Sequence, residues 1–269
     1  MAETDGAEMG VYVYGVSRDL PGASIEHLGG VGGAPVQVVA DRGLAAIVSP
    51  VSLEEFGEEA LRRNLEDLGW LESTARAHHA VVDTASGLAV TVPLGLATVY
   101  RSEDRVRTAL RVRREEFVEA LSRITGRTEW GVKVYADLAE TATGPEEGQR
   151  EESAADAKPG TSYLRRRRVQ RQTEEDARRE VLMTAERIDD DLCEIAATRR
   201  LHRPQDPQLS GERGWMILNA AYLVDDGRAD DFRTAVERLA GTRPEVRLQL
   251  TGPWAPYSFA TEEESWTDL

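Results

Sequence analysis

The most specific stretch of this sequence is Val246-Arg247-Leu248-Gln249-Leu250-Thr251-Gly252-Pro253-Trp254-Ala255-Pro256-Tyr257-Ser258-Phe259, close to its C-terminal end. Val246, Leu248 and Leu250 alternate with polar residues, which predicts a strand with one buried face and one solvated face. Gly252 and Pro253 then end the regular pairing, because proline has no N–H to donate and glycine bends freely. The second half of the chain therefore ends on a sheet.

Three large aromatic residues, Trp254, Tyr257 and Phe259, follow this strand on an irregular arm. Undocked, they would expose roughly 450–750 Å² of surface, since each buries about 150–250 Å² when packed. The largest apolar patch on a soluble monomer is about 300–600 Å². The arm is therefore expected to dock, either on its own domain or on a partner, and self-docking is favoured. These three residues are the candidates for partner binding or domain docking.

The composition limits the class of protein. With 269 residues, 41% of them hydrophobic and 30% charged, the chain suits one large globular domain or two ordinary ones. Its net charge of −15 argues against nucleic-acid binding. The single cysteine cannot form an internal disulfide, and no apolar run approaches the roughly 20 residues of a membrane span. We expect a cytoplasmic protein that binds neither nucleic acid nor a lipid membrane.

The first half predicts alternating strands and helices. Strands are expected over 11–16, 36–39, 44–48 and 88–92, and helices over 53–85 and 103–125. The second and third strands flank Asp41-Arg42-Gly43, and this arrangement predicts a hairpin with the glycine at its turn. Ser52 and Ser102 are the expected N-caps, and the first helical region should break near Gly57 or Gly69.

The second half begins on the strand 130–135, whose Gly131–Tyr135 segment resembles Gly10–Tyr14, which suggests that each half starts on a similar strand. An acidic flexible linker follows at about 138–160, then a long helix up to Arg203, a strand over 215–224 and a helix ending at Gly241. With the last strand, this order suits a split β-α-β arrangement with helices on one face. We therefore predict an α/β (α+β) protein with mostly antiparallel sheets, divided into domains 1–126 and 127–269.

The sequence contains no recognisable catalytic pattern. His78 and His79 are adjacent and diverge by about 100° on a helix, so they cannot ligate one metal ion as an i, i+4 pair could. Cys193 lies among inward helical positions and is expected to be inert. Asp189-Asp190-Asp191 is interpreted as a solvated helix face. No catalytic, cofactor-binding or metal-binding residue is predicted, and the protein is not expected to be an enzyme.

Several motifs together resemble the gas vesicle protein L/F family. They are Val11-Tyr12-Val13-Tyr14-Gly15, the segment from Val92-Pro93 to Val99-Tyr100, Trp130-Gly131-Val132-Lys133-Val134, and above all Leu250 to Phe259. The resemblance implies a two-domain fold with ferredoxin-like variations. One departure is that family members often carry Arg, Phe and Gly where this chain has Gly95, Leu96 and Ala97.

The resemblance also implies a function. Proteins of this family are accessory components of gas vesicles, cytoplasmic gas-filled protein shells, and are implicated in shell assembly. We therefore expect a non-enzymatic protein that binds the small hydrophobic major shell protein and other accessory proteins, either as an assembly factor or as part of the shell. No cofactor or small-molecule substrate is expected. Two alternatives stay open: an enzyme or sensor that binds a small molecule between the two halves, and an interaction module unrelated to gas vesicles.

Overall fold

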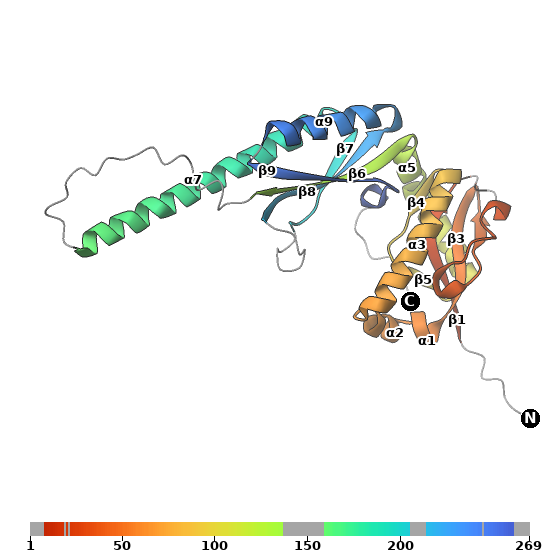
Figure 1. Ribbon diagram of the computed structural model, residues 1–269. Coiled ribbons are helices and arrows are strands. Elements are labelled where there is room, and N and C mark those ends of the chain that lie inside the picture. Colours follow the sequence, from red (N-terminus) through yellow and green to blue (C-terminus); the bar gives the residue numbers. More distant parts are fainter. Residues whose placement is uncertain are drawn as a thin grey trace, which may run out of the picture. The chain divides into compact units, whose positions relative to one another are not determined.

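The computed structural model describes residues 8–18, 20, 22–136, 159–204, 214–243 and 245–260 (Figure 1). Apart from its last two positions, the predicted linker at about 138–160 lies outside these residues. The chain divides into two compact units, one made of Met1–Glu129 with Pro253–Leu269 and the other of Trp130–Gly252. The aromatic arm thus packs with the first unit, whereas the sequence had placed it with the second half.

The first unit is built on a five-stranded sheet. Its strands are β1 (Met9–Ser17), β2 (Gln37–Asp41), β3 (Leu44–Ser52), β4 (Thr91–Pro93) and β5 (Val99–Tyr100). The order is β2-β3-β1-β4, and β5 also pairs with β1. The predicted hairpin is confirmed: β2 and β3 are antiparallel, and Arg42 and Gly43 have φ of 47° and 83° at the turn.

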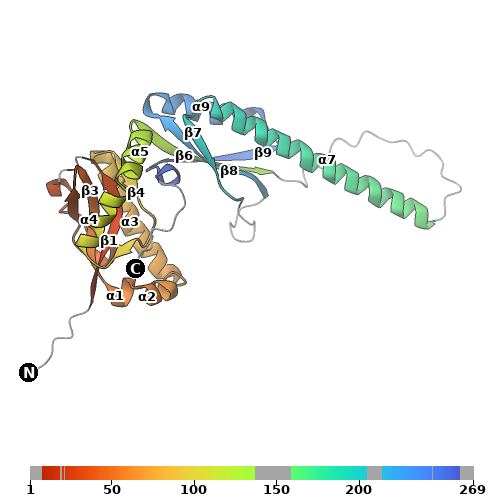
Figure 2. The ribbon, with the colours of Figure 1, turned by 180° about the vertical axis from the view of Figure 1, so that it is seen from behind.

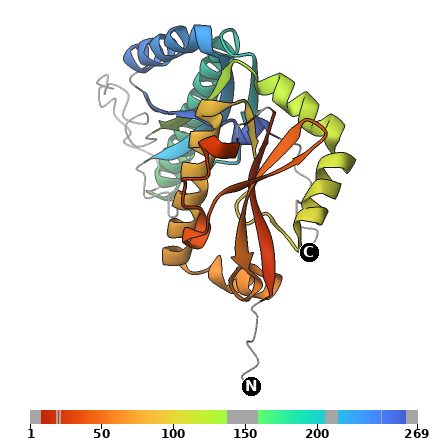
Figure 3. The ribbon, with the colours of Figure 1, turned by 90° about the vertical axis from the view of Figure 1, so that its right-hand side faces the viewer.

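Helices cover both faces of this sheet. α1 (Leu53–Phe56), α2 (Glu58–Asn64) and α3 (Leu68–Leu88) follow β3, while α4 (Glu103–Val112) and α5 (Arg114–Ile124) follow β5. Figure 3 shows α3 on one side of the sheet and α4 with α5 on the other. The side chains of β1 from Tyr12 to Ser17 are accordingly buried. Two short 3-10 helices, η1 (Gly22–Ser24) and η2 (Val31–Gly33), lie between β1 and β2.

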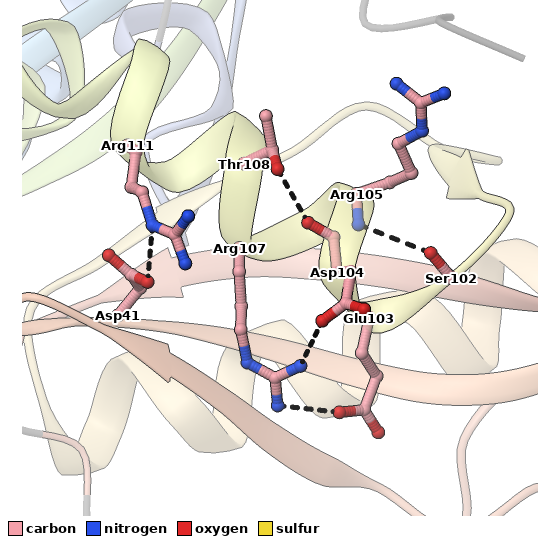
Figure 4. A network of polar contacts seen from close by, with 8 residues as sticks. All are labelled: Asp41, Ser102, Glu103, Asp104, Arg105, Arg107, Thr108 and Arg111. Carbon is pink, nitrogen blue, oxygen red and sulfur yellow. Dashed lines mark hydrogen bonds and ion pairs between the residues drawn. The ribbon is translucent and has the colours of Figure 1, made fainter.

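Caps and ion pairs fix these helices locally. The Ser52 and Ser102 hydroxyls accept hydrogen bonds from the N–H groups of Glu54 and Arg105, which confirms both predicted N-caps. The α4 helix is linked to β2 by a hydrogen bond in which Arg111 Nε donates to Asp41 Oδ2 at 2.8 Å (Figure 4). In the same view, Arg107 pairs with Glu103 and Asp104 along the helix surface.

The second unit has a β-α-β-β-α-β order. It contains β6 (Arg127–Ala136), α7 (Pro159–Cys193), β7 (Thr198–Leu201), β8 (Trp215–Asp225), the 3-10 helix η3 (Asp226–Arg228), α9 (Ala229–Thr242) and β9 (Val246–Trp254). The sheet order is β7-β8-β6-β9, which is the ferredoxin-like arrangement. Figures 1 and 2 show α7 and α9 on the same side of this sheet. The predicted fold class is confirmed.

One element was predicted wrongly. The long helix was expected to continue to Arg203, but α7 ends at Cys193, and Thr198–Leu201 form the edge strand β7. This strand pairs antiparallel with β8, Thr198 opposite Leu223 and Leu201 opposite Ala220. Its arginines were interpreted as charges favouring the C-terminal end of a helix, because four residues give too little alternation to reveal an edge strand.

Both units arrange their strands in the same way. When the strands are numbered within each unit, with β4 and β5 taken as one interrupted strand, both orders become second, third, first, fourth. The two similar segments, Gly10–Tyr14 and Gly131–Tyr135, lie on the first strand of their units, β1 and β6. The short sequence resemblance therefore corresponds to equivalent places in two sheets.

Candidate partner-binding surface

The aromatic arm divides into an anchor and an exposed part. After Trp254 at the end of β9, the chain continues through Ala255 and Pro256 into the 3-10 helix η4 (Tyr257–Phe259). Ala255 and Phe259 are only 6% and 5% exposed, whereas Trp254 remains 43% exposed. The three predicted site residues thus have different surroundings: Phe259 is buried, Tyr257 is half-buried and Trp254 reaches the surface.

Polar contacts hold the arm in the first unit. The Glu129 carboxylate, only 8% exposed, accepts hydrogen bonds from the Ser258 N–H at 2.8 Å and from the Ser258 hydroxyl at 2.7 Å. Arg123 Nη1 donates to the Phe259 carbonyl at 3.4 Å, and η4 lies against α5. A buried carboxylate needs such donors, since an uncompensated charge is costly. Glu129 is a residue that the sequence did not single out.

Tyr257 and Trp254 both contact His79 on α3. The ring centroids of His79 and Trp254 are 5.6 Å apart with an interplanar angle of 65°, and those of His79 and Tyr257 are 6.5 Å apart at 29°. We call His79, Trp254 and Tyr257 the aromatic patch. Burial, and then the negative charges of Asp83 and Glu129, raise the pKa of Tyr257, so its phenol stays neutral.

Beneath the patch, His78 belongs to a buried polar cluster. The Tyr12 hydroxyl accepts the Ala97 N–H at 3.0 Å and shares a 2.9 Å hydrogen bond with His78 Nδ1. The other ring nitrogen, Nε2, is buried and makes no hydrogen bond with the described residues. Burial lowers the pKa of His78 to about 4, and the Leu94 backbone opposes this shift. His78 is therefore a neutral core residue, and its ring also contacts Tyr257, at 6.1 Å between centroids.

The segment that departs from the family pattern lies above this cluster. Ala97 has φ of 64°, a left-handed backbone conformation that favours glycine. Its N–H bonds the Tyr12 hydroxyl, and its methyl group is almost fully buried. The position where the family resemblance implies a glycine is thus one where this chain holds an alanine in a glycine-like conformation.

In the second unit, Asp189 is buried and not solvated, which corrects its interpretation from the sequence. It is 6% exposed, accepts a 2.7 Å hydrogen bond from the Tyr222 hydroxyl and forms an ion pair with Arg199 on β7. Cys193, one turn further along α7, has its Sγ 3.7 Å from the same carboxylate. Burial, and then the charge of Asp190, raise the pKa of the Cys193 thiol, which disfavours the thiolate. Asp190, by contrast, is exposed as expected.

The first unit also contains a surface cleft. An open cleft of about 490 Å³ beside α1 and α2 is lined mainly by exposed side chains, including Glu54, Glu58, Glu59, Arg63 and Arg101. Across the residues that the structure describes, no cluster of His, Cys, Asp or Glu could hold a metal ion, and no helix is long and apolar enough to span a membrane. The arrangement that stands out is the aromatic patch.

Comparison with known proteins gives consistent matches along the whole chain. Residues 10–261 match the family model described as gas vesicle synthesis protein GvpL/GvpF. The chain is 43% identical over 251 residues to gas vesicle protein L of Streptomyces sp. (strain CB03234), covering 93% of this chain and 92% of that protein. It is 26% identical over 261 residues to gas vesicle protein F of the same strain, covering 93% and 99%.

Solved structures agree in fold. The crystal structure of gas vesicle protein GvpF from Anabaena sp. PCC7120 matches with a TM-score of 0.69 at 21% identity, over 95% of this chain and 98% of that one. GvpF from Microcystis aeruginosa matches with a TM-score of 0.66 at 19% identity, over 94% and 99%. At these identities the two matches establish the arrangement of helices and strands.

Proposed function

Because this chain belongs to the gas vesicle synthesis protein GvpL/GvpF family, we propose that it is a non-enzymatic accessory protein of gas vesicle assembly. It acts at gas vesicles in the cytoplasm, where it binds the small hydrophobic shell protein and other accessory proteins. The observation that carries this proposal is the 43% identity to a gas vesicle protein L across 93% of the chain. Similarity at that level and coverage makes a shared role the simplest interpretation.

The aromatic patch is the surface that we assign to partner binding. Large aromatic residues supply much of the energy in protein interfaces, and Trp254 exposes 43% of its surface while Phe259 anchors the arm. Trp254 is therefore held in place before any partner arrives, which reduces the entropy lost on binding. Phe259, because it is buried, supports the surface and does not contact the partner.

The non-enzymatic part of the proposal is supported by the chemistry of the described titratable groups. The groups with clearly shifted pKa values are four tyrosines, His78 and Cys193, and burial is the main cause each time. His78 is neutral at physiological pH, and its Nδ1 is already hydrogen-bonded to the Tyr12 hydroxyl. These groups stabilise a core and form no nucleophile with an adjacent base.

Co-purification with the shell protein tests this proposal. The full chain and the shell protein of its own gas vesicles are co-expressed, and capture is compared between the wild type, Trp254→Ala and the control Leu68→Ala, which removes another exposed apolar side chain, 80% accessible. We expect the wild type and Leu68→Ala to retain the shell protein and Trp254→Ala to retain clearly less. If both variants capture the shell protein as well as the wild type does, the aromatic patch is not the binding surface. Absence of capture by the wild type would overturn the proposal itself.

Fractionation separates an assembly factor from a shell component. Buoyant vesicles are collected by flotation and washed with urea before immunodetection of the chain. Retention after the wash indicates a shell component, and presence only in the soluble fraction with the shell protein indicates an assembly factor. A chain found in neither fraction would contradict the proposed location.

A further inference from the structure

Asp83 lies beside the aromatic patch on the same side of α3. It follows His79 by four residues, which places the two side chains on one face of the helix. Its side chain is exposed, and its negative charge acts on Tyr257 of the arm. Within the described part of the chain, no cation or hydrogen-bond donor is paired with the Asp83 carboxylate. A carboxylate thus lies near His79 and Tyr257 with no paired cation among the described residues.

The second unit shows how this chain uses aromatic rings with cations. The guanidinium of Arg178 lies 4.4 Å from the ring centroid of Trp215, and that of Arg247 lies 4.4 Å from the ring centroid of Tyr135. Ring faces attract cations through their quadrupole, most strongly in tryptophan. Among the described residues, no arginine or lysine stacks on Trp254 in this way. Trp254 and Asp83 offer the same kind of surface with an added negative charge.

We propose that Asp83 and the aromatic patch of His79, Trp254 and Tyr257 bind a lysine or arginine side chain of the partner polypeptide. The rings contact the alkyl stem of the partner's side chain and its terminal group, the planar guanidinium of arginine or the ammonium of lysine. The Asp83 carboxylate forms an ion pair with that positively charged group. The net charge of −15 steers a basic partner toward this surface. This inference rests on the proposed role of the patch in partner binding and adds the chemistry that is recognised.

A small probe tests the recognition without any gas vesicle component. Full-length protein labelled with ¹⁵N is titrated with N-acetyl-arginine amide, and the indole N–H signals of its five tryptophans are followed by NMR. Trp254→Phe identifies the Trp254 signal by its loss. N-acetyl-citrulline amide, which has nearly the same shape without the charge, is the matched control ligand. We expect a saturable shift of the Trp254 signal at roughly millimolar arginine derivative, an affinity suited to one side chain, and none with the citrulline derivative.

Two variants separate the charge from the rings. Asp83→Asn should weaken binding of the arginine derivative roughly fivefold, the upper range for one exposed charge pair, and should reduce its salt dependence. Glu66→Gln, which neutralises another exposed carboxylate, should leave the affinity unchanged. Trp254→Ala, followed by the Tyr257 and His79 signals, should abolish saturable binding while the protein remains folded.

The outcomes distinguish this inference from the proposed function. Equal shifts with the arginine and citrulline derivatives, or equal affinity of wild type and Asp83→Asn, would overturn the cation site. If the shell protein is captured by the wild type and by Asp83→Asn alike, the partner-binding role stands and the cation site is wrong. If the arginine derivative binds as expected but the shell protein is not captured, the cation site stands and the assigned partner is wrong.

Discussion

At the scale of single residues, the anchor and the exposed part of the arm should respond differently to truncation. Phe259→Ala should lower the free energy of unfolding by roughly 3–5 kcal/mol, because it leaves a cavity where a buried ring stood. Trp254→Ala should cost less than about 1 kcal/mol, since much of its ring is already in water. Urea denaturation of both variants measures the difference. Similar losses would show that Trp254 is a core residue and would weaken its assignment as a partner contact.

His78 should make the first unit sensitive to acid. Its folded pKa of about 4 lies below the ordinary value of 6.5, so between these two pH values the unfolded chain binds a proton that the folded chain does not. Stability should therefore be unaffected above pH 6.5, fall as the pH drops toward 4, and lose on the order of 3 kcal/mol in total. Unfolding midpoints of wild type and His78→Gln across this range provide the check. Equal slopes for the two proteins would contradict the assignment.

At the scale of elements, the Asp189 network should decide whether the edge strand β7 is ordered. Asp189→Asn removes the ion pair with Arg199, whose own side chain is 38% exposed, and weakens the contact with Tyr222, so we expect a loss of roughly 1–3 kcal/mol. Hydrogen exchange of the β7 amides should accelerate. The neighbouring Asp190→Asn, on the exposed side of α7, is the matched control and should change neither quantity. If both variants behave alike, the network does not hold β7.

Elements with a complete local signal were predictable from the sequence. The alternation in β9, the turn at Arg42 and Gly43, and the caps at Ser52 and Ser102 each depend on neighbouring residues, and all are present in the structure. Strand β7 was missed because its four residues carry two arginines and their partner Asp189 lies on α7. Short edge strands are specified mainly by the strand they pair with.

The candidate site was predictable only in part, for the same reason. The aromatic residues of the arm are conspicuous in the sequence, but His79, Asp83 and Glu129 become relevant only through contacts across long sequence separations. The i, i+4 spacing of His79 and Asp83 was available as a signal, although nothing local indicated which face of the helix the arm would cover. The sequence therefore identified the aromatic arm but not the face of α3 against which the arm packs.

At the scale of the whole molecule, the first unit should depend on residues that come after the second. A chain ending at Gly252 lacks Ala255, Phe259 and the Ser258 contacts of Glu129, so the transition of the first unit should shift to lower temperature by several degrees, as a loss of a few kcal/mol implies. Differential scanning calorimetry measures this shift. A chain ending at Ala260 keeps every described contact of the arm and is the control. An unchanged transition in the shorter chain would mean that the arm adds no stability.

The return of the chain to its first unit also sets the order of events during synthesis. Glu129 leaves the ribosome long before Ser258 and Phe259, its neighbours in the finished fold. At about 5–20 residues per second, the nascent first unit waits on the order of ten seconds for its last segment. During that interval the apolar surface of the first unit that Phe259 later covers is exposed to solvent, and another hydrophobic chain made nearby can bind to it. The rate of translation thus sets how long the first unit is open to a wrong partner.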